Sequence, residues 1–264
     1  MLDELLSDLR EESAFLLGVL EPLTAAGYAT PTPSPGWSIH DQITHLAHFD
    51  ELATAAIIRP DRFIAERDKL VAEGDDFTEV VAALHREREA ADVHDWFAHA
   101  RTALLEAFTS IDPQQRLPWF GPDMSPASSI TARLMETWAH GVDVTDTVGL
   151  EVSQTSRLRH VAHLGVATYA WSFRVHGRPE PTAPLRVELV SPDGQTWTWG
   201  PDAADRVTGP AVDFCLAVTQ RRHIDDLRLE ATGALARRFL GLAQAFAGPP
   251  GRGRAPRTSK ERTS

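Results

Sequence analysis

A carboxylate and an imidazole that can share one metal ion lie four residues apart in the stretch RLMETWAHGVDVTDTVG, residues 133–149. The spacing of the apolar residues around them predicts a helix. On a helix, residues four apart lie on one face, with their Cβ atoms about 5–6 Å apart. Glu136 and His140 are therefore close enough to bind the same ion, but they need a further ligand from elsewhere in the chain.

The best candidate for the third ligand is His45, in the stretch WSIHDQITHLAHFDELA, residues 37–53. It lies in the first half of a second predicted helix, one turn into its apolar stripe. His48 is the alternative, either as the ligand itself or as a group that orients one. Two imidazoles and one carboxylate are the protein ligands of many catalytic zinc sites, which leave a fourth position for water or substrate. The same set suits nickel or non-haem iron, so zinc is a default choice.

Other reactive side chains have simpler interpretations. Cys215 stands between Phe214 and Leu216, which favours an inert, buried thiol over a nucleophile. Asp143 and Asp146 either orient a metal ligand or form a solvated helix end. A glutamate and a histidine four residues apart are also an ordinary contact on a helix surface. The spacing by itself therefore leaves open a helical scaffold that binds no metal.

The elements that must position these residues are mostly helices. Leucines recur every three or four residues over 2–26, and Ser38, with Asp41 three residues on, is a predicted N-cap for a helix that begins near residue 39. Several long helices with irregular, proline-rich connections predict an up-and-down bundle over residues 1–176, and the interior of such a bundle commonly holds metal sites. Further helices are predicted over 61–74, over 76–110 with a break at Asp92 or Asp95, from Ser125 and Pro126 onward, and over 154–175.

The hydrophobic pattern changes after Gly177. Residues 184–200 alternate apolar and polar side chains and turn at Asp193 and Gly194, which predicts a β-hairpin. Residues 206–222 and 226–248 indicate further strand and helix elements. We therefore predict a mainly α chain with a small α+β domain over 177–248 and a disordered basic tail over 249–264.

Composition excludes several classes of function. The formal net charge is −11, which argues against nucleic-acid binding, because that function needs clustered cations. The single cysteine excludes an internal disulfide, and no apolar run approaches the about 18 residues of a membrane span. The acidic, amphipathic N-terminus differs from a signal peptide. We expect a cytoplasmic protein with a small-molecule substrate and no nucleic-acid or membrane partner, and a homodimer stays open.

Two motifs carry a resemblance to a known family. PSPGWSIHDQITHLAHFDELA, residues 33–53, resembles the entry motif of the DinB-like superfamily, particularly its mycothiol-dependent maleylpyruvate isomerase branch. ETWAHGVDV, residues 136–144, is similar to the second motif of that branch. The resemblance implies a DinB-like bundle with His45, Glu136 and His140 as metal ligands. It also likens the C-terminal domain to a small sterol-carrier-like domain.

The resemblance further implies an activity. The isomerases use a bound metal to hold a low-molecular-weight thiol, so we expect mycothiol or a similar thiol as cofactor. The expected reaction is isomerisation or S-transfer on a small, acidic substrate. Family members hold substrate carboxylates with a catalytic arginine in the C-terminal domain, and Arg221, or else Arg222, lies at about that place in VTQRR. The match is partial, because Gln220 stands where the family usually has glycine.

A second class of function stays open beside this one. The chain can equally be a metal-binding protein of the DinB-like superfamily without thiol chemistry. It would then be a binding or stress-response module, or a hydrolase that uses metal-bound water.

Overall fold

The structure is a computed structural model that describes residues 2–74 and 77–257. The chain divides into two compact units, Met1–Val152 and Ser153–Ser264. The first unit is helical and the second combines helices with a small sheet, which confirms the predicted fold class. Within the described residues, no helix is both long and apolar enough to cross a membrane.

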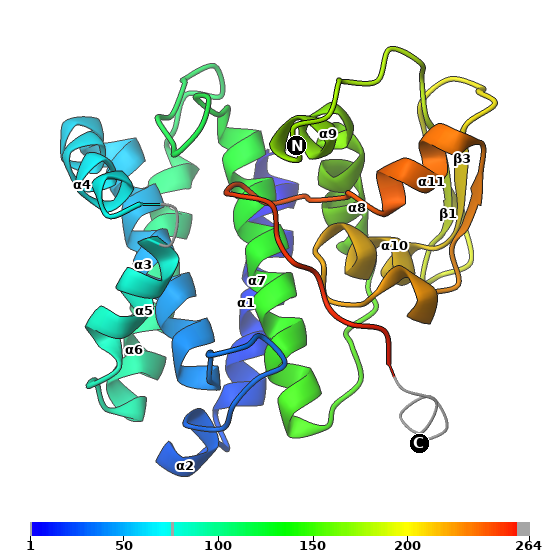
Figure 1. Cartoon of the computed structure of the whole chain (residues 1–264). Coiled ribbons are helices and arrows are strands. Elements are labelled where there is room, and N and C mark those ends of the chain that lie inside the picture. The colour runs from blue at the N-terminus through cyan, green and yellow to red at the C-terminus, as the bar shows by residue number, and fades with distance from the viewer. Residues whose placement is uncertain (1, 75–76, 258–264) are drawn as a thin grey trace. The chain divides into compact units, whose positions relative to one another are not determined.

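Four long helices form the body of the first unit. They pack as neighbours in the pairs α1 with α6 and α7, and α3 with α6 and α7 (Figure 1). Their apolar faces meet in a core that includes Leu16, Ile43, Leu46, Phe97 and Val144. This is the arrangement that amphipathic helices adopt to remove their apolar stripes from water. The helices of this unit are α1 (Leu2–Leu20), α2 (Ala25–Tyr28), α3 (Ile39–Ile58), α4 (Pro60–Ala72), α5 (Phe77–His85), α6 (Ala90–Thr109) and α7 (Pro126–Val148).

Local capping signals set where the two helices of the candidate site begin. At α3 the Ser38 side chain accepts a hydrogen bond from the Asp41 backbone N–H, and the Asp41 carboxylate accepts one from the Ser38 N–H. At α7 the Ser125 hydroxyl accepts from the Ser128 N–H, and Pro126 occupies the first turn. These caps confirm both predicted starts, and they fix the helical phase of the residues that follow.

Two predicted helices are interrupted at places the sequence analysis did not identify. The helix predicted over 2–26 ends at Leu20, and a separate turn, α2, begins after its N-cap Thr24. The helix predicted over 76–110 breaks between α5 and α6, before Asp92 rather than at it. Arg86 lies in that break and donates to the Asp41 carboxylate, with 3.0 Å between Nε and Oδ1. The break thus lets a side chain reach back to the start of α3.

The second unit is built on a four-stranded mixed sheet with the order β2-β1-β3-β4. β1 and β2 form the predicted antiparallel hairpin, with Gly194 in its turn at φ 81°, whereas β1 and β3 are parallel. Its elements are α8 (Leu158–Ala167), α9 (Tyr169–Val175), β1 (Arg186–Val190), β2 (Thr196–Trp199), β3 (Arg206–Pro210), α10 (Ala211–Val218), η1 (Ile224–Asp226), β4 (Glu230–Thr232) and α11 (Ala234–Leu240).

The division into units after Val152 lies earlier in the chain than the boundary predicted at 176. The reason is that the helix predicted over 154–175, which is broken into α8 and α9 at Thr168, packs on the C-terminal elements. α8 lies against α10 so closely that a Cβ on Gly165 would be 2.7 Å from a methyl carbon of Val218. A glycine is needed there, and it ties α8 to the second unit.

The C-terminal segment predicted as disordered is partly outside the described residues, since these end at 257. Residues 249–257 form neither helix nor strand, but they make specific hydrogen bonds. The Gly251 N–H donates to the buried amide of Gln244 at 3.1 Å, and the Arg257 N–H donates to the Asp226 carboxylate at 2.7 Å. The described part of the tail is therefore attached to the second unit.

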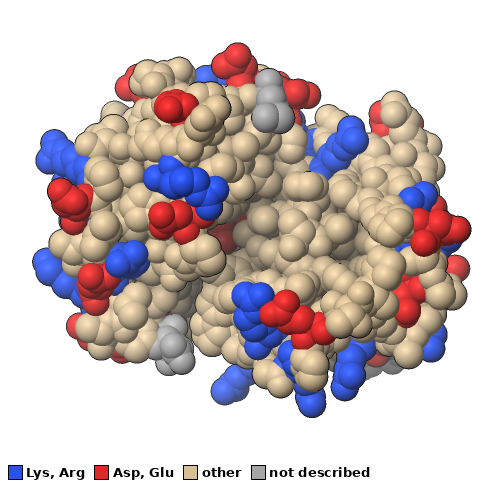
Figure 2. Space-filling model, turned by 90° about the horizontal axis from the view of Figure 1, so that it is seen from above, with Lys and Arg blue, Asp and Glu red and all other residues tan. Residues whose placement is uncertain are grey.

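Charged side chains of both signs are interspersed over the face of the molecule in Figure 2. Among the described residues on that face, Lys and Arg do not gather into one broad patch.

Candidate metal centre

Three side chains from two helices converge in the first unit. His45 projects from α3, and Glu136 and His140 project from α7. The Glu136 Oε2 atom lies 3.2 Å from His140 Nε2 and 3.5 Å from His45 Nε2. One ligand atom of each residue lies within 4.8 Å of the other two. The structure therefore brings together the three residues that the sequence analysis selected.

The spacing of these atoms fits a tetrahedral ion. Zinc binds imidazole nitrogen and carboxylate oxygen at about 2.0–2.1 Å, so two of its ligand atoms lie about 3.3 Å apart at the tetrahedral angle. The observed separations of 3.2 and 3.5 Å lie on either side of that value. The two distances from Glu136 Oε2 therefore match the spacing between ligand atoms around a tetrahedral zinc ion.

The electrostatics of the triad suit metal ligation. Both imidazoles are buried, each about 8% exposed. Burial, followed by the charge of His140, lowers the pKa of His45 to about 3. Burial would raise the pKa of Glu136, but hydrogen bonds from His140 and His45 and the nearby positive charges together hold it well below its ordinary value. At neutral pH His45 is uncharged and Glu136 is ionised, which are the protonation states that bind metals.

A hydrogen-bond chain sets the tautomer of His140. The Thr32 hydroxyl donates to the Trp37 carbonyl at 2.8 Å, so it accepts from the Gln42 side-chain NH₂ at 2.9 Å. The Gln42 carbonyl oxygen therefore faces His140 Nδ1, which must carry a proton to donate to it. Metal-ligating histidines usually donate their second ring N–H in this way. The sequence analysis did not identify Gln42, because its partner lies far away in the chain.

This tautomer leaves an unbalanced contact inside the triad. His140 Nε2 lies 3.2 Å from Glu136 Oε2 and donates to it when the ring carries a second proton. In the neutral ring the Nε2 lone pair faces that oxygen instead, and two acceptors at that distance repel each other. A cation between them, or a proton on His140, removes the repulsion. Since His45 Nε2 also lies 3.5 Å from the same oxygen, the position is well suited to a shared metal ion.

The loop before α3 covers the two imidazoles. The Trp37 ring stacks on His140 with 5.9 Å between centroids and lies 5.5 Å from His45. Its indole N–H donates to Glu79 at 2.9 Å, so its orientation is fixed from α5. Asp143, which is fully buried on α7, accepts from Ser34 at 2.9 Å and ties the loop to that helix. Trp37 is thus part of the wall of the site.

A buried ionic cluster holds the four long helices in register. The Asp50 carboxylate on α3 is fully buried and accepts from Arg101 Nε of α6 at 2.7 Å. The other guanidinium nitrogens of Arg101 donate to Ser13 on α1 and, at 3.0 Å, to Thr137 on α7. Arg133 Nη1 lies 3.6 Å from the same carboxylate. Because Thr137 follows a metal-ligand position, this cluster positions α7 on α3.

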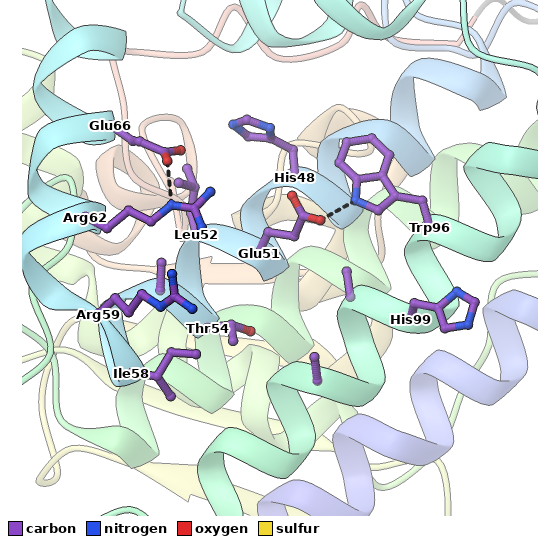
Figure 3. A pocket seen from close by; sticks show the side chains of 13 residues that line it. His48, Glu51, Leu52, Thr54, Ile58, Arg59, Arg62, Glu66, Trp96 and His99 are labelled. Carbon is purple, nitrogen blue, oxygen red and sulfur yellow. Dashed lines mark hydrogen bonds and ion pairs between the residues drawn. The ribbon is translucent and has the colours of Figure 1, made fainter.

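The alternative ligand His48 takes a different position from the triad. It lines a groove together with residues of α4 and α6 (Figure 3). Its ring lies 5.5 Å from that of His85, and burial together with the charge of His85 lowers the pKa of His48 to about 4. Among the described residues, the group able to hold a metal ion contains His45 and not His48.

The predicted arginine lies in the second unit, just after α10. The Arg221 guanidinium donates to the Thr219 carbonyl at 2.8 Å, and that of Arg222 donates to the Arg221 carbonyl at 2.8 Å. Gln220 has φ 57°, the left-handed conformation that glycine adopts most easily. This accounts for the glycine that the resemblance places at this position. Cys215 is fully buried, which raises the pKa of its thiol and agrees with an inert role.

Comparison with protein-family models places the N-terminal part of the chain in a known family. Residues 9–145, which include all three ligand positions, match the mycothiol maleylpyruvate isomerase N-terminal domain. The chain belongs to the mycothiol maleylpyruvate isomerase family. A second model, for wyosine base formation, matches residues 181–232 of the C-terminal unit, which the sequence analysis had likened to a sterol-carrier domain.

Two further comparisons found proteins similar to this chain. Two uncharacterized proteins from two strains of Mycobacterium tuberculosis are each 46% identical over 263 residues, covering 94% of this chain and 97% of the relative. The crystal structures of the mycothiol-dependent maleylpyruvate isomerase and of a mutant of it match with a TM-score of 0.60. They cover 87% of this chain and 93% of theirs at 14 and 15% identity, which shows a shared fold.

Proposed function

We propose that this protein is a metal-dependent enzyme that uses a low-molecular-weight thiol, mycothiol or a close relative, on a small acidic substrate. The reaction would be isomerisation or S-transfer. His45, Glu136 and His140 would hold the divalent ion, with zinc the first choice and nickel or iron the alternatives. The observation that carries the proposal is the contact between Glu136 Oε2 and the two imidazole Nε2 atoms at 3.2 and 3.5 Å.

The bound ion and the residues around the triad have distinct parts in this proposal. A bound divalent ion would lower the pKa of a coordinated thiol, so that it is present as the nucleophilic thiolate near neutral pH. Gln42 holds the His140 proton on Nδ1 and so leaves Nε2 as the ligand atom. Trp37 stacks on His140 and limits the access of water to that ring. We propose Arg221, or Arg222 beside it, as the cation that binds a carboxylate of the substrate.

The similarity to the mycothiol-dependent maleylpyruvate isomerase supports thiol chemistry by analogy. At 14 and 15% identity it says nothing about the substrate of this chain, because one fold supports many reactions. The small-acid substrate therefore rests on the family resemblance and on the arginine pair after α10.

Metal content is the first test. The protein is purified without a metal-affinity tag, and its metal content is measured by elemental mass spectrometry. The measurement compares wild type with His45→Ala and His140→Ala. His163→Ala, which replaces an exposed histidine of the second unit, is the control. We expect one divalent ion per chain in wild type and control, and a large loss in both ligand variants. If wild type stays metal-free after zinc or nickel is supplied, the site and the enzyme proposal are both wrong.

Thiol binding is the second test and separates the two classes of function. The metal-loaded protein is titrated with mycothiol and with its S-methyl derivative, which cannot form a thiolate. We expect only the free thiol to bind, and thiol-dependent turnover of an acidic substrate such as maleylpyruvate to fail in Arg221→Ala. Stoichiometric metal without thiol affinity would instead support a binding module or a hydrolase that uses metal-bound water.

A further inference from the structure

A second concave site lies in the first unit, away from the three ligand residues. It is a groove of about 390 Å³ between α3, α4 and α6, and neither His45, Glu136 nor His140 lines it. Its volume is within the range of about 300–1,000 Å³ that is typical of small-molecule sites. Figure 3 shows the Arg59 and Arg62 side chains extending from the α4 side toward α3 and α6.

The groove combines an apolar surface with polar groups at its edges. Leu52 and Ala55 of α3 and Ala100 and Ala103 of α6 supply apolar surface, and the Trp96 ring is also part of the lining. These small side chains leave room for a ligand body of several carbon atoms. The rest of the lining is polar or charged, and such groups fix the orientation of a ligand in an organic-ligand site.

The charged residues of the groove differ in how their hydrogen-bonding capacity is used. The Glu51 carboxylate accepts from the Trp96 indole N–H at 2.7 Å, and Glu66 accepts from Arg62 Nε at 2.8 Å. Arg59, the residue that joins α3 to α4, makes no side-chain hydrogen bond or ion pair with the residues that the structure describes. Glu66 is thus paired with a cation, Glu51 is held by a neutral donor and keeps its negative charge, and the Arg59 guanidinium is available to a ligand.

We infer that this groove binds a small organic anion, a carboxylate with an apolar body. Its carboxylate would pair with the Arg59 guanidinium, whose fork of N–H donors matches carboxylate geometry. Its body would lie along Ala100 and Ala103 and against the Trp96 ring. This inference does not depend on the proposed metal chemistry.

His48 adds a further polar group to the same groove. Its Nε2 atom is buried and has no hydrogen-bond partner among the described residues. A buried polar nitrogen without a partner has a free-energy cost of about 1–3 kcal/mol, which a ligand atom that hydrogen-bonds to it would remove. Because the Nε2 atom is shielded from solvent, the group that the groove directly offers to a ligand is the cationic donor at Arg59.

The indole N–H of Trp96 provides a local readout of binding. Full-length protein labelled with ¹⁵N in the tryptophan indoles is titrated with 3-phenylpropionate, with its neutral analogue 3-phenylpropan-1-ol, and with propionate, which lacks the apolar body. The Trp96 and Trp37 signals are assigned by Trp→Phe variants. We expect 3-phenylpropionate to shift the Trp96 signal at millimolar concentrations and to bind at least fivefold more tightly than the other two compounds.

Three variants test the placement of the ligand. Arg59→Gln should weaken binding about threefold to tenfold, the range for a partly exposed charge-assisted pair. Ala103→Leu should abolish binding by filling the groove, and Arg10→Gln, which replaces an exposed arginine on α1, should leave it unchanged. A shift of Trp37 without a shift of Trp96 would place the carboxylate at the metal centre instead. That result, or equal affinity of Arg59→Gln and wild type, would overturn the inference.

Discussion

The buried cluster around Asp50 leads to a quantitative prediction about stability. Arg101→Met removes the cation that contacts Asp50 at 2.7 Å and that donates to Ser13 and Thr137. Removing one partner of a buried ion pair typically costs about 3–5 kcal/mol, because it leaves an uncompensated charge. Arg133 remains 3.6 Å from the carboxylate, so we expect a loss near the lower end, about 3 kcal/mol.

The same geometry predicts an order among variants. Asp50→Asn removes the anion that faces both Arg101 and Arg133, and so leaves two buried guanidinium groups without a counter-charge. It should therefore destabilise the protein more than Arg101→Met does. Arg10→Met, which changes an exposed arginine, should lie within about 0.5 kcal/mol of wild type.

Urea denaturation, followed by both circular dichroism and tryptophan fluorescence, measures these differences. Because the chain has two units, the free energies are compared only where the two signals give one coincident transition. Metal affinity should fall along with stability, because Arg101 of α6 donates to Thr137, the residue next to the proposed ligand Glu136. An Arg101→Met protein as stable as wild type, or one less stable than Asp50→Asn, would refute the reasoning.

Three further predictions follow from the described contacts. Gln42→Leu removes the oxygen that accepts the Nδ1 proton of His140, and it should weaken zinc binding about 10- to 100-fold. Competition with a chelator measures this affinity, and an unchanged affinity would contradict the prediction. For His48, whose pKa is about 4 folded and about 6.5 unfolded, only the unfolded state gains a proton as pH falls between these values. The free energy of unfolding should therefore fall by up to about 1.4 kcal/mol per pH unit as the pH is lowered through that window, and it should fall less steeply in His48→Gln. Equal slopes in the two proteins would show that His48 does not contribute. Gly165→Ala should destabilise the protein by about 1–3 kcal/mol, because the added methyl group overpacks the contact with α10. Gly18 on α1 has open space around it, so Gly18→Ala should stabilise the protein by about 0.5–1 kcal/mol. Thermal or urea denaturation measures both changes, and the same sign for both would contradict the packing argument.

Local sequence signals determined a large part of the site. The capping residues Ser38 and Asp41 set the start of α3, and Pro126 set the start of α7. Once a helix is in phase, the spacing of Glu136 and His140 places both on one face. These features involve residues within a few positions of each other, so their geometry follows from backbone periodicity without reference to the rest of the chain.

Only the tertiary structure decided which side chains join that pair. His45 and His48 lie on the same helix, and the packing of α3 against α7 brings His45 to Glu136 while His48 lines the groove with α4 and α6. Gln42 and Asp50 were equally unrecognisable in the sequence, because their partners His140 and Arg101 are distant in the chain.

The division into units also depended on packing rather than on local pattern. Helical periodicity over 154–175 is the same whether the helix joins the bundle or the sheet. Its packing on the C-terminal elements, including the close approach of Gly165 to Val218, assigns it to the second unit. Hydrogen-bonding and hydrophobic contacts between distant segments depend on how helices are oriented in space. The sequence of a helix determines which of its faces is apolar, whereas the packing of the whole fold determines which other helix or sheet that face contacts.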